Sequence, residues 1–227
     1  MLTCLITGAN RGIGLEFARQ YAAAGWFVIA TCRHPERADA LTAVEGNVQV
    51  HALDVADFAR MEKLARHFDD VAIDILINNA GIYGPRVTPY DFVDYGIWAE
   101  ALRTNTMAPL KLSAVFSRHV ARSRRRLIVS LSTVMGSVAE NTSGGFYIYR
   151  SSKAALNAVM KSLAIDLRSK EITVVVVHPG WVRTDMGGPR ADLDAGEAVD
   201  ALRALFQRLT LKDSGRFFRS NGDEVPW

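Results

Sequence analysis

The feature that most constrains the fold is a glycine-rich run close to the start of the chain. Residues 2–7 are apolar and predict a β-strand, residues 15–24 carry a helical pattern, and Gly8, Gly12 and Gly14 lie between them. Residues without a Cβ atom allow a tight turn and close packing of the helix on the strand. The chain therefore begins as strand, glycine loop and helix. A simple tight turn is the alternative to a binding loop.

Strands and helices continue to alternate along the rest of the chain. Residues 172–177 are almost all β-branched, which is typical of a parallel strand that is buried on both faces. No repeat, linker or break in composition interrupts the pattern, so it predicts one doubly wound, Rossmann-type α/β domain over residues 1–227, with a parallel sheet of about seven strands. The expected strands are 2–7, 26–31, 47–53, 73–77, 127–131, 172–177 and 215–220, and the expected helices are 15–24, 57–68, 95–120, 149–170 and 195–209.

Composition excludes several other classes of protein. A hydrophobic content of 49% with 22% charged residues is typical of a soluble globular chain. No apolar run approaches the roughly 20 residues that span a bilayer, and the apolar start lacks the basic region and cleavage site of a signal peptide. Cys4 and Cys32 lie at opposite ends of neighbouring expected strands, too far apart for a disulfide. We therefore expect a cytoplasmic protein without membrane contact.

The glycine loop is also a candidate anion site. Backbone N–H groups at a helix N-terminus bind phosphate, and glycines let a pyrophosphate approach the backbone. About 20 residues later, where an acidic residue would bind a ribose 2′-hydroxyl, the chain has Cys32 and then Arg33. A guanidinium binds a 2′-phosphate instead, so NADP is favoured over NAD, and a merely solvated Arg33 is the alternative. The predicted loop contacts are Gly8, Asn10, Arg11, Gly12, Ile13 and Gly14.

Polar residues follow two further strands at the edge where open parallel sheets bind ligands. Asp54 comes after the third expected strand and can accept from an adenine amino group, or it can cap the helix that begins near residue 57. Residues 78–81 follow the fourth strand, where two asparagines can satisfy loop backbone groups and contact a ligand ribose. The predicted cofactor contacts at these ends are Asp54, Val55, Asn79, Ala80 and Gly81.

Tyr149 and Lys153 are the leading candidates for acid–base chemistry. They are four residues apart, so a helix carries both side chains on one face. An ammonium near a phenol lowers the pKa of the phenol, which would bring Tyr149 closer to general acid–base work at neutral pH. The alternative is a surface pair on an amphipathic helix.

Two other positions carry polar groups into apolar surroundings. Asn105 lies four residues before Pro109, which cannot donate its amide, and this predicts a locally irregular helix or, alternatively, an exposed asparagine. Ser132 and Thr133 end the fifth expected strand, where hydroxyl groups would face a ligand.

Together these motifs resemble those of the short-chain dehydrogenase/reductase family along essentially the whole chain. Thr7–Gly14 resembles the cofactor loop of that family, and Asn78–Gly81 resembles its second signature. Tyr149 with Lys153 resembles its catalytic pair, and His178–Gly180 resembles the segment that passes the nicotinamide. Residues 141–150 and the ending Pro226-Trp227 resemble the C-factor and sniffer-type carbonyl reductase branch.

The resemblance implies an NADPH-dependent reductase of carbonyl compounds. Tyr149 would protonate the carbonyl oxygen while hydride from NADPH reaches the carbon. Lys153 would lower the pKa of Tyr149, and both residues would also contact the nicotinamide ribose. Asn105 would support a water-linked proton relay. The nicotinamide segment adds Pro179, Gly180, Val182 and Thr184 to the expected cofactor contacts.

One position departs from the family pattern. Ser132-Thr133 stands where the family usually has two serines, and Thr133 occupies the catalytic one. A threonine hydroxyl has the same donor and acceptor capacity, but its methyl group stiffens χ1. We expect activity with an altered rate or substrate, and Ser132 is the fallback hydroxyl.

The expected substrate is a hydrophobic aldehyde, ketone or quinone, in a pocket that residues 82–86 help to wall and that Gly187–Pro189 can cover as a lid. A signalling protein of the C-factor type that senses NADP(H) is the alternative on the same fold.

We expect no metal and no nucleic acid, since the arginines at 118–126 read as a solvated helix end without interleaved aromatic residues. The helices 95–120 and 149–169 are the expected contacts of a homodimer or homotetramer, although the branch includes monomers. The expected apolar lining, for which core packing is the alternative, is Ile82, Met135, Phe146 and Trp181.

Overall fold

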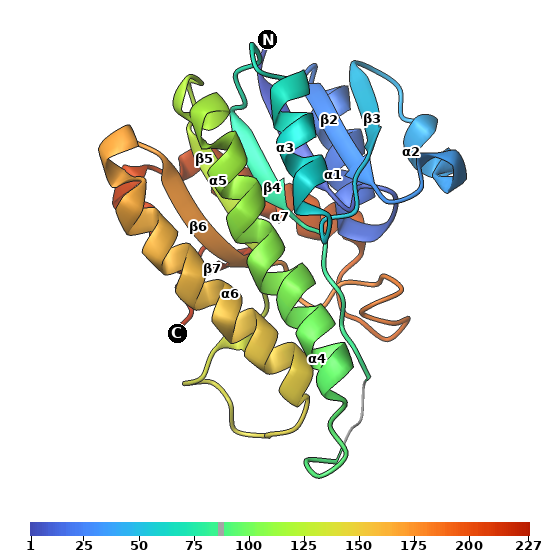
Figure 1. Cartoon of the computed structure of the whole chain (residues 1–227), viewed down its shortest axis with the longest axis vertical. Coiled ribbons are helices and arrows are strands. Elements are labelled where there is room, and N and C mark those ends of the chain that lie inside the picture. The colour runs from blue at the N-terminus through green and yellow to red at the C-terminus, as the bar shows by residue number, and fades with distance from the viewer. Residues whose placement is uncertain (86–88) are drawn as a thin grey trace.

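The computed structural model describes residues 1–85 and 89–227. In this part of the chain, seven strands form one parallel sheet in the order β3-β2-β1-β4-β5-β6-β7 (Figure 1). The predicted single doubly wound, Rossmann-type domain is confirmed. The strands are β1 (Thr3–Thr7), β2 (Phe27–Cys32), β3 (Val48–Ala52), β4 (Ile75–Asn78), β5 (Leu127–Leu131), β6 (Thr173–His178) and β7 (Phe217–Arg219).

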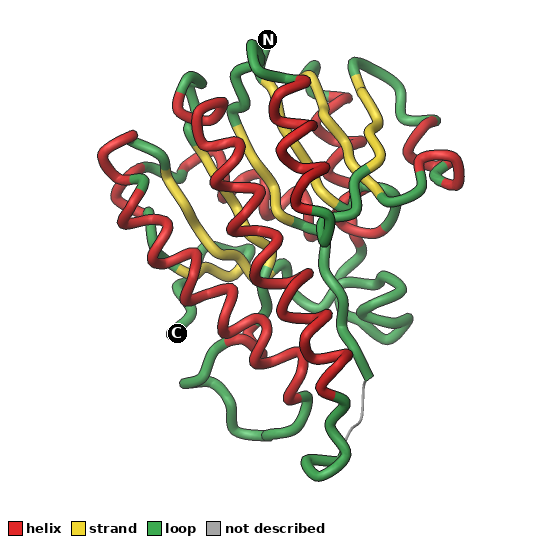
Figure 2. The backbone as a smooth tube through the Cα atoms, viewed as in Figure 1, coloured by secondary structure: helices red, strands yellow, loops and turns green. Residues whose placement is uncertain are grey.

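Helices cover both faces of the sheet, as the colouring by secondary structure makes plain (Figure 2). Successive strand residues point to opposite faces, so Leu5 packs with the layer of α3, α5 and α6, whereas Ile6 packs with the layer of α1 and α7. The helices are α1 (Gly12–Ala23), α2 (Asp39–Thr42), α3 (Phe58–His67), α4 (Tyr95–Leu102), α5 (Ala108–Ala121), α6 (Tyr147–Asp166) and α7 (Ala195–Arg208).

Several element boundaries differ from the expected ones. Helix α1 begins at Gly12, inside the glycine loop, and α6 begins at Tyr147, two residues before the expected start. Asp57, and not Asp54, caps α3 by accepting from the amide of Arg60. The N-cap interpretation of Asp54 is therefore wrong, because the helix starts three residues too late for that side chain to reach its first turn.

The expected long helix at 95–120 is interrupted, as the proline predicted. A π-helical turn, Arg103–Met107, separates α4 from α5, and Pro109 lies in the first turn of α5. Proline has no amide hydrogen to give to the preceding turn, and a π turn accommodates one extra residue. The irregular stretch contains Asn105, whose side chain is fully buried.

The arginines near the end of α5 are more than a solvated helix end. Arg122 donates to the carbonyls of Asp69 and Val71 beyond α3, and Arg126 pairs with Glu171 before β6. Arg125 donates to the carbonyl of Phe206 in α7. These side chains tie neighbouring connections to the sheet at the end away from the strand carboxyl termini.

Two further sequence expectations concern the core and the membrane. Cys4 and Cys32 are both buried and free, as their distant strand positions required. Within residues 1–85 and 89–227, none of the helices combines the length and the apolar character that crossing a bilayer requires.

Candidate active site

A cleft of about 280 Å³ opens where the strands end at their carboxyl termini. It collects most of the predicted site residues, although they come from widely separated parts of the chain. The predicted residues that line it are Gly8, Asn10, Arg11, Gly12, Ile13, Arg33, Asp54, Val55, Asn79, Ala80, Gly81, Ser132, Tyr149, Lys153, Pro179 and Thr184. The others, Gly14, Asn105, Thr133, Gly180 and Val182, are not among the residues that line it.

The glycine loop forms one wall of this cleft because its backbone packs where side chains cannot. A Cβ atom at Gly14 would lie 2.3 Å from the carbonyl oxygen of Gly8 and 2.5 Å from Nδ2 of Asn79. No side chain caps the N-terminus of α1. No side chain among the described residues therefore accepts from the first backbone amides of this 12-residue helix, and these amides can bind an anion in the cleft.

Asn79 holds this loop in place. Its Nδ2 donates to the carbonyls of Thr7 (2.8 Å) and Gly8 (3.0 Å), while its backbone amide and that of Ala80 donate to the Thr7 hydroxyl (both 3.1 Å). The expected use of an asparagine to satisfy loop backbone groups is confirmed at this residue. The loop after β1 and the loop after β4 are thereby built as one unit.

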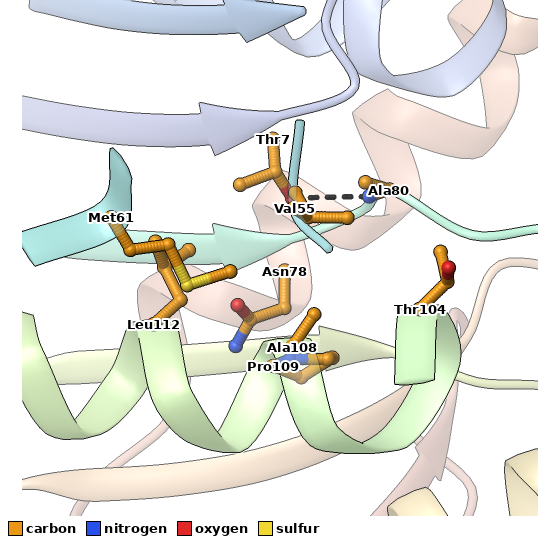
Figure 3. Close-up of a pocket in the computed structure, with 9 residues that line it drawn as sticks. All are labelled: Thr7, Val55, Met61, Asn78, Ala80, Thr104, Ala108, Pro109 and Leu112. Atoms are coloured by element: carbon orange, nitrogen blue, oxygen red, sulfur yellow. Dashed lines mark hydrogen bonds between the residues drawn. The ribbon is translucent and has the colours of Figure 1, made fainter. Parts of the chain in front are cut away.

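Asn78, the other member of the pair, faces into the protein. Its Nδ2 donates to the hydroxyls of Ser113 in α5 and Ser130 in β5, each at 3.1 Å. It borders a small cavity behind the cleft, in which the polar Thr7, Asn78 and Thr104 face the apolar Met61 and Leu112 (Figure 3). The hydrogen bond drawn there joins Thr7 to Ala80, and Ala80 lines both this cavity and the cleft.

The end of the cleft beside β2 is basic. Cys32 and Arg33 line it at the end of β2, and Arg11 approaches from the glycine loop. The guanidinium of Arg11 lies 2.6 Å from the carboxylate of Asp185, in the loop after β6. Both side chains are largely exposed, so this ion pair contributes less than about 1 kcal/mol to stability. It nevertheless bridges the two loops that face each other across the cleft.

Asp54 lines the cleft at the end of the third strand. One of its carboxylate oxygens accepts from the amide of Ala56 at 2.9 Å, which forms a local turn before Asp57 caps α3. Among the described residues the second oxygen accepts no hydrogen bond, and the carboxylate is placed to accept one from a ligand.

Asn105 holds the segment that follows β4. Its Oδ1 accepts from the amide of Ile82 and its Nδ2 donates to the carbonyl of Ile82, both at 2.8 Å. Nδ2 also donates to the hydroxyl of Ser152 in α6 at 2.9 Å. The side-chain amide therefore links Ile82 to α6. Its position in a π turn leaves the surrounding backbone carbonyls out of regular α-helical bonding.

Tyr149 and Lys153 lie on adjacent turns of α6, and both line the cleft. The Lys153 ammonium lies 6.0 Å from the centre of the Tyr149 ring and donates to the carbonyl of Leu131 at 2.8 Å. A Cβ atom at Gly81 would lie 3.6 Å from this Nζ and 3.1 Å from Oδ1 of Asn105. The glycine is therefore the point at which the loop after β4 passes the candidate catalytic side chains.

Burial moves both titratable groups of the pair toward their neutral forms. It lowers the pKa of Lys153 to about 8 and raises the pKa of Tyr149, to which neighbouring Tyr83 also contributes. The expected lowering of the Tyr149 pKa by Lys153 is wrong for this structure, because loss of hydration outweighs the ammonium at this distance. At neutral pH the phenol keeps its proton and can act as an acid.

The two hydroxyls at the end of β5 have different partners. Ser132 donates to Oδ1 of Asn157 in α6 at 2.8 Å. Thr133 accepts from the amide of Met135 at 3.2 Å and caps the short 3₁₀ turn Val134–Gly136. Because a hydroxyl that accepts can still donate its own hydrogen, Thr133 retains a donor, whereas the Ser132 hydrogen is already engaged.

Aromatic and thioether side chains surround the phenol end of Tyr149. Tyr83 stacks on the Tyr149 ring with centroids 4.2 Å apart, and Phe146 meets Tyr83 edge-on. The hydroxyl of Tyr83 points to Sδ of Met135 at 3.8 Å, and that of Tyr149 to Sδ of Met186 at 4.0 Å. Met135 and Phe146, which were expected to line the pocket, contact Tyr83 and are not among the residues that line the cleft.

Two other expected wall residues have different outcomes. Ile82 lines the cleft, as expected. Trp181 is half exposed, and its Nε1 donates to the carbonyl of Gly187 at 2.9 Å, so it closes its own loop and is not packed in the core. Arg86, the last residue of the expected wall segment, lies outside the described residues.

The loop after β6 reaches over the glycine loop. Thr184 lies 3.1 Å from the position that a Cβ atom at Gly12 would take, and its hydroxyl accepts from the amide of Gly187 at 3.0 Å. Gly180 has a φ of +94°, and Val182 is buried. The stretch proposed as a lid is thus fastened to Thr184 at its start. Asp185 and Met186, between Thr184 and this stretch, line the cleft.

Sequence reasoning missed several residues that line the cleft. Asp185 and Met186 follow directly on the predicted nicotinamide segment, and Glu100 and Thr104 lie within five residues of Asn105, so proximity to a motif was the available signal. Tyr83 belongs to the segment 82–86 that was expected to help wall the pocket, but its stacking on Tyr149 was not predicted. The unpredicted lining residues are Cys32, Leu53, Ala56, Glu100, Thr104, Leu131, Asp185 and Met186.

This cleft, with its glycine loop, its strand-end asparagines and its helical tyrosine and lysine, belongs to a known class of α/β oxidoreductases. Residues 2–194 match the family model described as short chain dehydrogenase. The chain belongs to the short-chain dehydrogenase family, and the predicted family is confirmed.

Individual relatives support the predicted branch. The chain is 42% identical to the C-signal of Myxococcus xanthus over 155 residues, which are 68% of this chain and 93% of the relative. The solved structure of the carbonyl reductase Sniffer of D. melanogaster is similar with a TM-score of 0.93 and 33% identity, covering 100% of both chains. The NADPH-bound carbonyl reductase from chicken fatty liver is similar with a TM-score of 0.90 and 32% identity, covering 99% of this chain and 98% of the other.

Proposed function

We propose that this protein is an NADPH-dependent oxidoreductase that reduces the carbonyl group of an aldehyde, ketone or quinone to an alcohol, with Tyr149 as the general acid. The observation that carries this proposal is the meeting of Tyr149 and Lys153 with the glycine loop in one cleft. The NADPH-bound carbonyl reductase among the similar structures supports the same reaction class.

The residues of the cleft fit NADPH. The uncapped N-terminus of α1 suits a pyrophosphate, and the backbone of Gly8 and Gly14 leaves no room for side chains between the loop and its neighbours. Arg33 and Arg11 are the cations for a 2′-phosphate, and β2 ends in Cys32, where a carboxylate would repel that group. Asp54, Val55 and the segment from Pro179 to Thr184 would hold the adenine and nicotinamide ends.

The bound cofactor would supply the hydride that adds to the carbonyl carbon. Tyr149 donates its phenolic proton to the carbonyl oxygen, and its raised pKa keeps that proton in place at neutral pH. Thr133 donates its hydroxyl hydrogen to the same oxygen. Lys153, charged below a pKa of about 8, favours the phenolate that the proton transfer leaves behind and returns a proton toward it.

Asn105 acts through the backbone in this proposal. Its amide holds both polar backbone groups of Ile82, which fixes the loop that passes Lys153 at Gly81. The π turn around it leaves carbonyl groups that a water molecule can use to connect Lys153 to solvent.

The decisive experiment is to follow NADPH oxidation with a panel of aldehydes, quinones and diketones, in parallel with NADH. We expect turnover that prefers NADPH and that falls by at least about 100-fold in Tyr149→Phe, since general acid catalysis contributes 10²–10⁴-fold. Tyr147→Phe is the matched control, because this exposed tyrosine lies at the start of the same helix. Equal loss in both variants, or no turnover with any carbonyl, would contradict the proposal.

The C-signal relative favours one alternative of a different class, a signalling protein that senses NADP(H). The two functions separate in a Tyr149→Phe variant that still binds NADPH. Loss of the protein's biological effect in this variant would favour the reductase function. An unchanged biological effect would favour a protein that senses NADP(H).

Three further parts of the proposal accompany this function. Residues 1–227 form a single NADP-binding domain, the protein acts in the cytoplasm, and α4–α5 with α6 offer the contacts for a homodimer or homotetramer. Light scattering of the purified protein would test the last point, and a monomer would remove it without affecting the reaction.

A further inference from the structure

The proposed function leaves one feature beside the cleft unexplained, the stack of Tyr83 on Tyr149. Tyr83 and Tyr149 have ring centroids 4.2 Å apart and an interplanar angle of 27°. Tyr83 lies in the loop after β4, whereas Tyr149 lies in the first turns of α6. Stacked aromatic rings attract each other beyond the effect of the area that they bury.

The backbone on both sides of Tyr83 is held firmly. Asn105 binds the amide and the carbonyl of Ile82, the residue before it, at 2.8 Å each. Gly84, the residue after it, has a φ of +76°, and a Cβ atom there would lie 3.3 Å from Cγ2 of Ile148. Asn105 therefore ties the loop down before Tyr83, and after Tyr83 the backbone passes close to Ile148 of α6.

The Tyr83 side chain is held as well. Phe146 contacts it edge-on, with centroids 6.1 Å apart and an interplanar angle of 80°. On the opposite element, Sδ of Met135 lies 3.8 Å from the Tyr83 hydroxyl. The ring thus stands in a clamp made by the loop after β5 and the start of α6.

Phe146 reaches this clamp from a strained backbone. It precedes α6 with a φ of +51°, in the left-handed region that a bulky side chain rarely adopts. The two residues before it, Gly144 and Gly145, also have positive φ values. Such strain persists only where the surroundings enforce it, and it gathers at functional sites. Here it turns the Phe146 ring onto Tyr83.

We infer that Tyr83 is a positioning residue for the proton donor: its clamped ring stacks on Tyr149, fixes the direction of the phenolic hydroxyl and shields that face of the ring from water. The inference rests on the function proposed above, in which Tyr149 donates the proton. It predicts that the ring of Tyr83 matters, and its hydroxyl does not.

The consequence is a separation between cofactor binding and chemistry. The stack lies beside the phenol and away from the glycine loop, so its loss leaves NADPH binding intact. Without the stack, the Tyr149 hydroxyl spends less time in the direction that protonates the carbonyl oxygen, which lowers kcat. A ketone that is hydrogen-bonded to this hydroxyl is then also oriented less strictly. Hydride transfer to the two faces of a prochiral ketone therefore becomes less selective.

The test compares Tyr83→Leu with Tyr83→Phe, and uses Tyr90→Leu as the matched control, because Tyr90 is an exposed tyrosine further along the same connection. For Tyr83→Leu we expect kcat to fall by about fivefold to tenfold, because the ring stack is lost. The NADPH Kd should stay within about twofold of the parent value. The alcohol formed from a prochiral ketone should have a lower enantiomeric ratio. Tyr83→Phe should restore both kcat and the ratio. A structural defect would lower the fraction of active sites without changing the ratio.

A second readout does not depend on turnover. The absorbance of tyrosinate, measured as the difference between each variant and its Tyr149→Phe double variant, reports the titration of Tyr149 alone. Burial raises the pKa of this phenol, and the stacked Tyr83 ring covers one face of Tyr149, so Tyr149 should titrate at lower pH in Tyr83→Leu than in Tyr83→Phe.

Two outcomes would overturn the inference. One is a Tyr83→Leu variant with the parent enantiomeric ratio, kcat and Tyr149 titration. The other is a Tyr83→Phe variant as impaired as Tyr83→Leu, which would assign the role to the hydroxyl. If Tyr149→Phe keeps full turnover, the proposed function fails instead, and the titration readout still decides whether the stack shields Tyr149.

Discussion

The two halves of the cleft are built by different means. The cofactor half, around the ends of β1, β2 and β4, is made mainly of backbone: glycines, helix amides and carbonyls tied by Asn79. The carbonyl half, around Tyr149, is made of side chains from three long connections, held by ring stacking and thioether contacts. A backbone site tolerates change of almost any neighbouring side chain, but not an added Cβ atom. A side-chain site tolerates conservative replacements and depends on the chemical groups themselves.

The largest effect should come from removing a hydroxyl in the carbonyl half. Thr133→Val keeps the shape and loses the donor, so we expect kcat to fall by about 100-fold, the usual cost of losing one donor to a developing oxyanion. The NADPH Kd should be unchanged. Thr133→Ser is the matched control and should retain activity.

The opposite result would move the donor role to another residue. If Thr133→Val remains active and Ser132→Ala does not, Ser132 is the working hydroxyl. Steady-state kinetics with titration of NADPH binding separates these outcomes.

In the cofactor half, adding a single methyl group should be enough to weaken NADPH binding. Gly14→Ala places a Cβ atom 2.3 Å from the carbonyl oxygen of Gly8, and overpacking of this kind costs about 1–3 kcal/mol. We expect the NADPH Kd to rise by at least about tenfold, measured by fluorescence titration. Gly25→Ala carries the backbone strain of a φ of +75° but meets nothing within 4 Å, so it controls for a general loss of stability and should leave the Kd unchanged. Equal weakening in both variants would argue against a backbone-built site.

Arg33 tests whether the cofactor half also has a side-chain component. Arg33→Ala should raise the KM for NADPH by about tenfold, because a charge-assisted hydrogen bond contributes about 1.5–3 kcal/mol. The KM for NADH should not change. Arg37→Ala, an exposed arginine four residues further on, is the control, and a parallel loss for both cofactors would exclude a 2′-phosphate contact.

The pH dependence should report the carbonyl half. Burial lowers the pKa of Lys153 to about 8, so the ammonium is present below this pH and is lost as the pH rises through it. The value of kcat/KM, which reflects the free enzyme, should fall by up to about tenfold per unit above pH 8. A profile that stays level through pH 9 would show that the Lys153 charge does not contribute.

The smallest effect should come from the ion pair between the two halves. Asp185→Asn releases Arg11 for the cofactor, and we expect the KM for NADPH to fall by about twofold to threefold, since an exposed ion pair contributes less than about 1 kcal/mol. Asp192→Asn makes the same charge change elsewhere in the same loop. If both substitutions act equally, only net charge is involved.

The same division explains what the sequence could predict. The cofactor half follows from short motifs, because glycines and strand-end asparagines must stand at fixed places along the chain, and Gly8, Asn79 and Gly81 lie where their spacing predicted. The irregular helix at Asn105 was predictable from Pro109 alone.

The carbonyl half resisted prediction because its contacts join loops without periodicity. Neither the stack of Tyr83 on Tyr149 nor the left-handed φ of Phe146 follows from a local pattern. The direction of the Tyr149 pKa shift was wrong because burial, which the sequence does not give, exceeds the effect of Lys153. Asp54 failed as a helix cap for a simpler reason, since Asp57 is equally suited and lies closer to the helix.

The parallel sheet also sets the order in which the protein can acquire its site. Each neighbouring pair of strands is parallel, so no hairpin can start the sheet, and every pairing waits for the connection between its strands to be made. β1 can pair with β2 early in synthesis, but its other edge waits for β4, where Cys4 lies opposite Ile75. Because Asn79 supplies the bonds that hold the carbonyls of Thr7 and Gly8, the glycine loop leaves the ribosome first and takes its binding shape only after β4 has followed.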